Sequence, residues 1–437
     1  MTNPIENGPL SPQEAAIRVQ ASLKKRARSE RRFQYLGIAA ITLSILFLVL
    51  LFAGIFSKGI PGMFQHYVTL EVLLDKDRMD PEGDMSAASL YSGDARGIVN
   101  ESLMNALGSP DGRKAKRAAR AILSSASASR LTEFAIKNPE YIGEIVAVKF
   151  AVDDDIDSFL RGFIARETPE SDRRVNDQTI EFVDRLNQAS LISYEFSDYL
   201  FTGSASRDAE IAGIKGALIG SIWTLGVCLL IAFPLGVATA VYLEEIAPKN
   251  RMTEIIEINI NNLAAVPSVV FGIMGLAIFI IVFGLPRSIP LVGGIVLALM
   301  TLPTIIISSR AAIRAVPPSI RDAALGVGAS KMQTILHHVI PPAMPGMLTG
   351  TIIGMAQALG ETAPLLMIGM VAFIVDVPGG VMEPATALPV QIFMWADFAE
   401  RMFIQKTSAA IIVLLAFLIT MNAGAIILRK KLERRWQ

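Results

Sequence analysis

Long apolar runs alternate with charged segments along this chain of 437 residues, and their lengths predict its organisation. A run of about 20 residues without a charge is long enough to cross the hydrocarbon of a bilayer as a helix. Five runs meet this length, and they cover residues 33–57, 216–243, 258–286, 288–309 and 407–428. A sixth, from about Met344 to Ile374, is interrupted by Glu361. The pattern predicts six membrane spans.

The first run follows a cluster of basic residues and could be taken for a cleaved signal peptide. The apolar core of a signal peptide usually has about 7–15 residues and is followed by a cleavage site with small residues. The run from Phe33 to Ser57 is longer than that. We therefore expect a retained anchor at 33–57, preceded by a basic cytoplasmic segment at 1–32.

Basic residues flank the spans unequally. The N-terminal segment, the loop at 310–341 and the tail at 429–437 are rich in Lys and Arg. The short loops of opposite parity contain only Arg287, Arg401 and Lys406. Because Lys and Arg beside membrane spans are retained in the cytoplasm, we expect both termini to be cytoplasmic.

The polar segment between the first two spans, residues 58–210, is long enough to fold around its own core, and the topology places it in the periplasm. Apolar and β-branched residues predict strands, and helical spacing predicts helices elsewhere in the segment. The predicted strands are Tyr67–Leu74 and Glu144–Val152, and the predicted helices are Gly112–Ser125 and Asp177–Leu191. We therefore expect an all-α membrane protein with an α+β periplasmic insert.

Composition agrees with a membrane protein, since 52% of the residues are hydrophobic and 18% are charged. Acidic and basic residues both number 40, so the net charge indicates no nucleic-acid partner. The only cysteine, Cys228, excludes an intrachain disulfide and is expected to pack as a small apolar residue.

One acidic run resembles a calcium-binding loop at its start. Asp153, Asp155 and Asp157 have the required spacing. Ser158 and Ile164, however, take the positions where such a loop needs Gly and Glu. The run is better explained as the acidic start of a helix, and we predict no metal and no cofactor.

The loop after the fourth run contains a short helix with an apolar face. Tandem prolines at 317 and 318 suit its start, and glycines suit its end. Its apolar positions follow i, i+3, i+4 and i+7: Ile320, Ala323, Ala324 and Val327. A short helix is marginal in water, so this face needs a cover. Either a groove in a partner or the chain's own membrane ends would supply it.

The same loop resembles the EAA loop of ABC importer permeases, whose pattern is Glu-Ala-Ala, three residues, Gly, nine residues, Ile, one residue, Leu-Pro. The matching residues are Asp322, Ala323, Ala324, Gly328, Ile340 and Pro341. Asp322 replaces Glu, His338 replaces Ile, and Ile340 replaces Leu. The resemblance implies the type I ABC importer permease fold and a coupling helix that docks on an ATPase. The docking residues it implies are Ile320, Asp322, Ala323, Ala324, Val327 and Gly328.

The sixth run contains a second resemblance. Residues 360–366 read Gly-Glu-Thr-Ala-Pro-Leu-Leu, which is similar to a segment of phosphate permeases of the PstA type. The resemblance extends over 211–428, and 58–210 resembles the N-terminal extension of a PstA subgroup. It implies a permease subunit of an ATP-driven phosphate importer in a bacterial inner (plasma) membrane. The implied partners are a second homologous permease, two ATPase subunits and a periplasmic phosphate-binding protein, besides membrane lipid.

Glu361 is the residue of this run that physical chemistry singles out. A carboxylate within a membrane span is costly unless it is paired or hydrated. Gly360 and Pro364 would loosen the helix beside it, which is tolerated where the backbone lines a watery cavity. The nearest candidates for a pairing cation in sequence are Arg310 and Arg314, and a partner chain could supply one instead.

Two interpretations of these residues remain open. Arg310 could attract phosphate while Glu361 orients an arginine, or the two could form a structural clamp between helices. PstA-type permeases commonly carry Arg four residues before that Glu, whereas this chain has Gln357, so the partner permease would supply the charge. The candidates for the translocation path are Arg310, Arg314, Gln357, Gly360, Glu361 and Thr362.

Two other functions compete with phosphate import. The coupling loop is common to importers of molybdate, sulfate and phosphonate, and only residues 360–366 favour phosphate. A membrane sensor with a periplasmic ligand domain would need a cytoplasmic output domain, and the cytoplasmic segments are too short for one. The chain contains no G-x-x-x-x-G-K-[ST] string that would bind ATP, so we expect a permease and not an enzyme.

Overall fold

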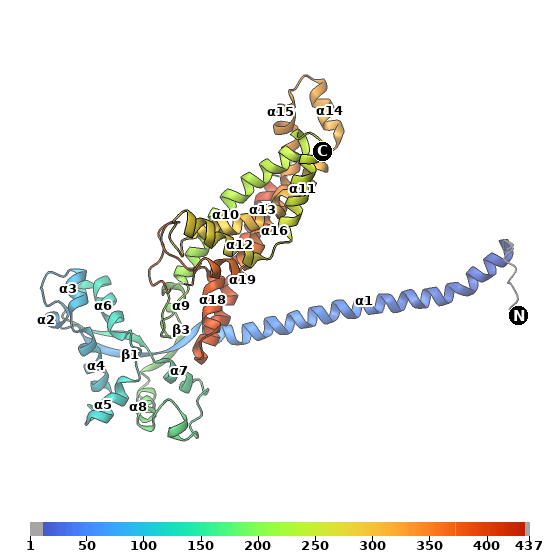
Figure 1. Ribbon diagram of the computed structural model, residues 1–437. Coiled ribbons are helices and arrows are strands. Elements are labelled where there is room, and N and C mark those ends of the chain that lie inside the picture. The colour runs from blue at the N-terminus through green and yellow to red at the C-terminus, as the bar shows by residue number, and fades with distance from the viewer. Residues whose placement is uncertain (1–11, 372, 433–437) are drawn as a thin grey trace. The chain divides into compact units, whose positions relative to one another are not determined.

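The computed structural model of the protein describes residues 12–371 and 373–432 (Figure 1). The chain divides into two units, residues 1–57 and residues 58–437. Helix α1 (Pro12–Gly62) supplies the first unit, and its part from Arg26 onwards is long and apolar enough to cross a membrane. The anchor predicted at 33–57 lies inside this helix. The predicted tail at 429–437 lies only partly within the described residues.

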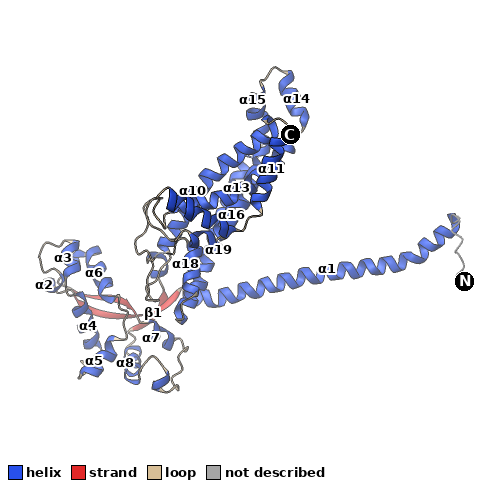
Figure 2. Cartoon of the chain, viewed as in Figure 1, coloured by secondary structure: helices blue, strands red, loops and turns tan. Residues whose placement is uncertain are grey.

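Residues 58–210, the insert domain, contain a three-stranded antiparallel sheet with the strand order β2-β1-β3 (Figure 2). The strands are β1 (Phe64–Leu73), β2 (Ile145–Ala151) and β3 (Ile192–Phe196). Tyr67 pairs with Ala151 across one edge of β1, and Val68 pairs with Ile192 across the other. β1 and β2 lie at the two predicted strands. β3 was not predicted, because five residues show too few alternations to identify a strand.

Short helices connect and cover the strands of the insert domain. They are α2 (Lys76–Met79), α3 (Ala87–Ser92), α4 (Ala95–Ala106), α5 (Arg113–Arg120), α6 (Ser127–Lys137), η1 (Pro139–Tyr141), α7 (Asp154–Leu160), η2 (Glu170–Asp172), α8 (Asp177–Gln188) and α9 (Tyr199–Thr202). Val68, Leu70 and Val72 of β1 share a buried core with Phe150 of β2 and Phe182 of α8. The insert domain therefore has a core of its own, as its length predicts.

Residues 211–432 form a bundle that consists almost entirely of helices. They are α10 (Lys215–Val241), η3 (Tyr242–Ile246), α11 (Arg251–Ala264), α12 (Ser268–Gly275), η4 (Leu276–Val282), α13 (Pro290–Arg314), α14 (Pro318–Gly326), α15 (Lys331–Thr334), η5 (Ile335–Val339), α16 (Ile340–Gly360), α17 (Ala363–Met367), α18 (Leu388–Ala396) and α19 (Arg401–Leu432). The π-helical segments η3, η4 and η5 continue or precede α-helices without a break.

The central helix of the bundle is α13, which packs against both α10 and α16. Glycines allow the close approach. A Cβ atom added to Gly294 of α13 would lie 2.5 Å from Val227 of α10, and one added to Gly350 of α16 would overlap Ser308 of α13. In a membrane, where lipid competes for apolar surface, such small residues let helices gain van der Waals contact.

Five helices of the described residues are long and apolar enough to cross a membrane, or six if one bent pair counts as a span. That pair lies at the span predicted at 258–286. α11 and the α12–η4 segment meet at 101°. The bend follows from Pro267, which has no N–H to donate and disfavours helical geometry at Val266.

The sixth predicted span also differs from expectation. A continuous helix runs from Lys331 to Gly360, so it starts earlier than Met344 and does not continue to Ile374. Glu361 has an extended backbone with φ −81° and ψ 114°, and the short helix α17 follows. The loosening predicted at Gly360 is therefore a complete helix end.

Candidate functional site

Helix α14 lies at the end of the bundle formed by the last turns of α10 and α13 and the first of α16. Pro317 precedes the helix and Pro318 is its first residue, where a missing N–H costs nothing. Ala324 is buried, and Ile320 packs half-buried against the ends of these neighbouring helices. The apolar cluster that receives Ile320 consists of Ala240, Ile313, Val316, Val339, Ala343 and Met347.

The predicted apolar face of α14 is divided between two environments. Ile320 and Ala324 face the bundle, whereas Ala323 and Val327 are exposed. Ala323 lies within the helix, whereas Val327 lies just beyond its last residue, Gly326. The bundle covers only one side of α14. A partner could therefore still cover the other side, so both alternatives from the sequence remain relevant.

The other side of α14 and the following turn present apolar groups to the surroundings. Val327 is 86% exposed, and Leu325 and Met332 are each about half exposed. We call Ala323, Leu325, Val327 and Met332 the exposed apolar loop. Asp322 and Gly328 are exposed beside it, and Gly328 has φ +92°, a conformation that favours glycine.

Arg321 fastens α14 to the bundle. Its guanidinium pairs with the Glu245 carboxylate at 2.6 Å and donates to the carbonyl oxygens of Val316 at 2.7 Å and Ile313 at 3.0 Å. Those carbonyls lie at the end of α13, where a helix leaves C=O groups without intrahelical donors. One side chain therefore joins α14, η3 and α13.

Arg310 and Arg314 pair with glutamates of η3 and α11, and not with Glu361. Arg310 lies 2.5 Å from a Glu244 oxygen and 2.7 Å from a Glu257 oxygen. Arg314 also reaches Glu244, at 2.8 Å. Neither of the two candidate cations therefore pairs with Glu361, and the alternative of a cation from a partner chain stays a prediction.

Glu361 occupies the helix break between α16 and α17. Its side chain is half-buried and makes no hydrogen bond or ion pair with any residue that the structure describes. Thr362 is also half-buried, while Gln357, one turn earlier, and Gly360 are exposed. The four path candidates on this segment thus lie close together in sequence at the end of α16, whereas the two arginines pair with glutamates of η3 and α11.

Sequence analysis missed Glu244, Glu245 and Glu257 as functional partners. They lie between the second and third apolar runs, in a segment at 244–257 that also contains Lys249 and Arg251. A signal was nevertheless present, because this acidic loop and the basic loop at 310–341 are expected on the same side of the membrane. Opposite charges on neighbouring loops favour pairing.

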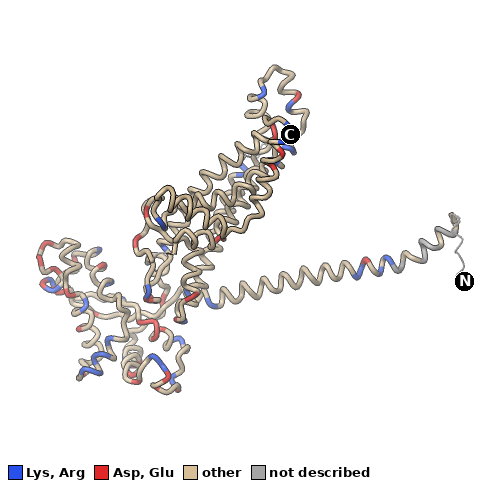
Figure 3. The backbone as a smooth tube through the Cα atoms, in the orientation of Figure 1, with Lys and Arg blue, Asp and Glu red and all other residues tan. Residues whose placement is uncertain are grey.

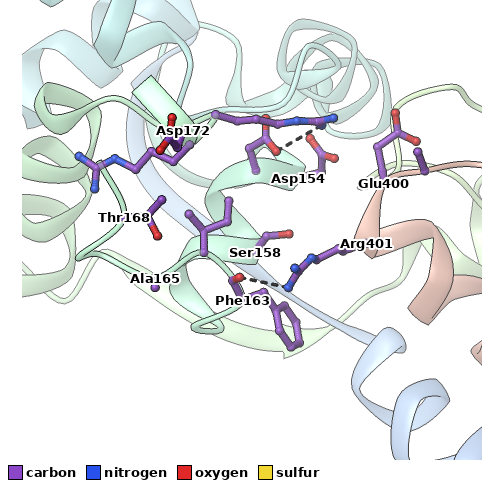
Figure 4. Close-up of a pocket in the computed structure, with 13 residues that line it drawn as sticks. Asp154, Ser158, Phe163, Ala165, Thr168, Asp172, Glu400 and Arg401 are labelled. Atoms are coloured by element: carbon purple, nitrogen blue, oxygen red, sulfur yellow. Dashed lines mark hydrogen bonds and ion pairs between the residues drawn. The ribbon is translucent and has the colours of Figure 1, made fainter. Parts of the chain in front are cut away.

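A cavity of about 400 Å³ lies beside α7, lined by residues of the insert domain and by Ala399, Glu400 and Arg401 at the start of α19 (Figure 4). Arg401 donates to the Phe163 carbonyl oxygen at 3.1 Å across its wall. Burial raises the pKa of Asp154 there, and the negative charge of Asp155 adds to the effect. No sequence signal indicated this cavity, which brings together residues about 240 positions apart.

The acidic run beside this cavity forms a group of three carboxylates, Asp153, Asp154 and Asp155, whose oxygens lie within 4.8 Å of one another. Asp153 accepts the Asp155 N–H and caps α7. Asp155 lies 3.6 Å from Arg174. These contacts agree with the interpretation of a helix start, and the absence of a metal stays a prediction.

Two family models match the chain. Residues 232–437 match the binding-protein-dependent transport system inner membrane components, and residues 20–170 match a domain of unknown function, DUF3333. The first therefore covers most of the bundle, and the second covers much of α1 and the insert domain.

Individual proteins agree with the first match. The chain is 34% identical over 181 residues to the probable ABC transporter permease protein YqgI of Bacillus subtilis, which covers 41% of this chain and 60% of that protein. It is 32% identical over 225 residues to the phosphate transport system permease protein PstA 1 of Mycobacterium tuberculosis, covering 51% and 72%. A chain of the inward-facing MetNI methionine ABC transporter has a TM-score of 0.41 and 15% identity, covering 49% and 95%. From the sequence relatives, the chain belongs to the binding-protein-dependent transport system inner membrane components, as an ABC transporter permease of the phosphate-transport PstA type.

Proposed function

We propose that this permease forms half of a phosphate translocation pathway and is driven by separate ATPase subunits that bind at α14. As a family member the chain is a multi-pass inner-membrane ABC importer permease, and permeases of this kind are not themselves enzymes. The observation that carries the proposal is the divided helix α14. One side is fixed to the bundle and the other presents the exposed apolar loop.

The exposed apolar loop fits a partner that moves the bundle. Large exposed apolar groups in an aqueous loop indicate a protein contact. Ile320 and Ala324, together with Arg321, hold α14 firmly enough that a pull on the loop would reach the membrane helices. In this proposal, ATP-driven closure of two ATPases displaces α14, and the spans alternate between outward-open and inward-open states.

Phosphate is the proposed cargo because the relative from Mycobacterium tuberculosis is named as a phosphate permease and residues 360–366 resemble the PstA segment. Glu361 lacks a partner within the described chain, so its charge is available to orient a cation of the second permease. Arg310 is better explained as a structural clamp, since Glu244 and Glu257 balance its charge. The positive charge that attracts phosphate would then come from the second permease.

The proposed complex contains this chain, a second homologous permease, two ATPases and a periplasmic phosphate-binding protein. Both termini and α14 face the cytoplasm, and the α+β insert at 58–210 faces the periplasm, as the basic residues beside the spans require. Residues 211–428 then form the transmembrane domain shared by importers of this family.

Docking at α14 can be tested by copurification of the ATPase with the permease. We expect Val327→Asp to abolish copurification and phosphate uptake, because it places a charge in the apolar contact. Val327 is almost fully exposed, so folding should be unaffected, and Val327→Ala serves as the size control. Undiminished ATPase binding to the aspartate variant would refute the docking surface.

The cargo is tested by uptake in a strain that lacks this permease. High-affinity phosphate uptake should disappear and return with the wild-type gene. If phosphate uptake were unchanged while molybdate, sulfate or phosphonate uptake fell, the importer class would stand but the phosphate assignment would not.

A further inference from the structure

Six charged residues gather at the end of the bundle that carries α14, where Figure 3 shows blue and red segments side by side. We call them the arginine–glutamate cluster: Arg310, Arg314, Arg321, Glu244, Glu245 and Glu257. They belong to two segments that are far apart in sequence, one containing η3 and α11 and the other containing α13 and the start of α14.

Two adjacent glutamates hold the cluster together. Glu244 receives Arg310 at 2.5 Å and Arg314 at 2.8 Å, so it binds α13. Glu245 receives Arg321 at 2.6 Å, so it binds α14. Both glutamates lie on η3, a π-helical turn that continues α10. A displacement of α13 or α14 therefore acts on adjacent residues of one short turn, η3.

The pairs that link these elements are shielded from water. The side chains of Glu244 and Glu245 are each 12% exposed, and that of Arg310 is 9% exposed. Charges in such partly dehydrated surroundings interact more strongly than exposed ones, and removing one partner leaves the other uncompensated. Arg321 adds two bonds to the carbonyl end of α13. The linkage is therefore stiff.

The π-helical turn is a suitable place for such a linkage. A π turn interrupts the regular i→i−4 hydrogen bonding and is often found at functional positions in helices. Here it follows α10, whose close packing on α13 extends along the bundle. By contrast, the apolar contact of α14 with the bundle is small, since only Ile320 and Ala324 contribute.

We propose that Arg321, Glu245 and Glu244 form a coupling relay, in which the movement of α14 passes through η3 into α10 and α13. The relay rests on the proposed function, because it needs an ATPase that displaces α14. These are positioning residues: they contact neither phosphate nor nucleotide. Their charge contacts transmit displacement that the small apolar contact cannot transmit alone.

The test uses the complete transporter in proteoliposomes with its binding protein, and compares phosphate imported with ATP hydrolysed. We expect Glu245→Gln to keep the ATPase bound and hydrolysing, while phosphate imported per ATP falls about tenfold, as for a lost coupling free energy between sites. The conservative variant Glu245→Asp, which keeps the negative charge opposite Arg321, should retain most of the wild-type ratio. Glu254→Gln on α11, an exposed glutamate one helical turn from Glu257, is the matched control and should leave the ratio unchanged.

An unchanged ratio in Glu245→Gln would overturn the relay. So would a loss of the bound ATPase in the same variant, because the pair would then serve docking and not transmission. Failure of the proposed function looks different, since wild-type protein itself would then bind no ATPase or import no phosphate.

Discussion

Two clusters of charged residues lie at opposite ends of the bundle and serve it differently. The arginine–glutamate cluster joins η3, α11, α13 and α14 through pairs of side chains. The other, which we call the junction cluster, joins the insert domain to α19 and consists of His66, Asp157, Arg161, Gln405 and Lys406.

The junction cluster is more deeply buried and is anchored on backbone atoms. The side chains of Asp157 and Arg161 are 2% and 8% exposed, and Lys406 is fully buried. Arg161 donates to the Pro61 and Phe64 carbonyl oxygens and to Gln405. Lys406 donates to the carbonyl oxygens of residues 210 and 212, just before α10.

The difference shows that ion pairs can serve two purposes, since they can fix one domain on another or transmit a displacement between helices. Backbone carbonyls cannot rotate away, so the junction cluster holds the insert domain rigidly on α19. The arginine–glutamate cluster lies on a π turn beside the exposed apolar loop, so a displacement of α14 would pass through it to η3 and α13 while the charges stay matched. We therefore expect mutations at the junction to lower stability, and mutations near α14 to lower coupling.

The largest effect is expected at Gly328, which lies beside the exposed apolar loop in the region proposed to move with the ATPase. Gly328→Asp should abolish transport without preventing membrane insertion, because it adds a charge to the docking surface. Uptake assays and membrane fractionation measure the two results. Gly328→Ala imposes the same backbone strain at φ +92°, of order 1–3 kcal/mol, without the charge, and should retain transport. Normal transport by the aspartate variant would count against docking at this loop.

A large loss of stability is expected at the junction. Asp157→Ala leaves Arg161 buried without its carboxylate partner and removes the acceptor of the His66 amide and ring nitrogen. Breaking such a buried pair costs about 3–5 kcal/mol. Thermal unfolding of the purified protein should show a clearly lowered midpoint. A midpoint within error of wild type would mean that the junction cluster does not stabilise the attachment of the insert domain to α19.

A smaller effect is expected from pH near the junction. Burial, with the neighbouring charge of Asp154, raises the pKa of Asp153 from 3.8 to about 7. Between these values the folded protein retains a proton that the unfolded chain has lost, so stability falls as pH rises from about 4 to about 7, by up to about 1.4 kcal/mol per pH unit.

Asp153→Asn should flatten this dependence, because Asn still accepts a hydrogen bond at the helix start but does not titrate. Unfolding midpoints at pH 5 and pH 7 compare the two proteins. Some slope should persist in the variant, since burial also raises the pKa of Glu210. An equal slope in both proteins would show that Asp153 is not the titrating group.

The smallest effect is expected within the arginine–glutamate cluster itself, at its exposed member. Arg314 is 62% exposed, and exposed pairs contribute less than about 1 kcal/mol. Arg314→Gln should therefore change stability little, whereas Arg310→Gln should destabilise the protein more, because it leaves Glu244 and Glu257 to repel each other. Equal losses in the two variants would contradict the role assigned to burial.

Most helices of the bundle could be predicted from the sequence, since the length of an uncharged run shows directly whether it can span a membrane. The end of α16 beside Glu361 and the start of α14 at Pro318 also follow from local chemistry, because glycine and proline act on the backbone where they stand. The bend at Pro267 could have been predicted by the same rule. It was not, because the apolar run continues without a charge on both sides of this proline.

Pairing between distant residues could not be predicted in this way. Arg310 and Glu361 are neighbours in the order of spans, yet Arg310 pairs with Glu244 and Glu257. Many combinations of charges satisfy the same pattern, and only the packing of α10, α11 and α13 selects one. The division of α14 was hidden for the same reason, since periodicity shows an apolar face but not its cover.

By itself the sequence determined the membrane runs, the place of the insert domain, the short helix at α14 and the absence of a nucleotide-binding loop. Tertiary structure alone decided which carboxylate neutralises each arginine, which side of α14 remains exposed and how the insert domain is held on α19. The physical reason is the difference in sequence separation over which the two kinds of interaction act. Hydrophobic length and backbone constraints act within one segment, whereas ion pairs and burial depend on distances between segments that only the folded chain sets.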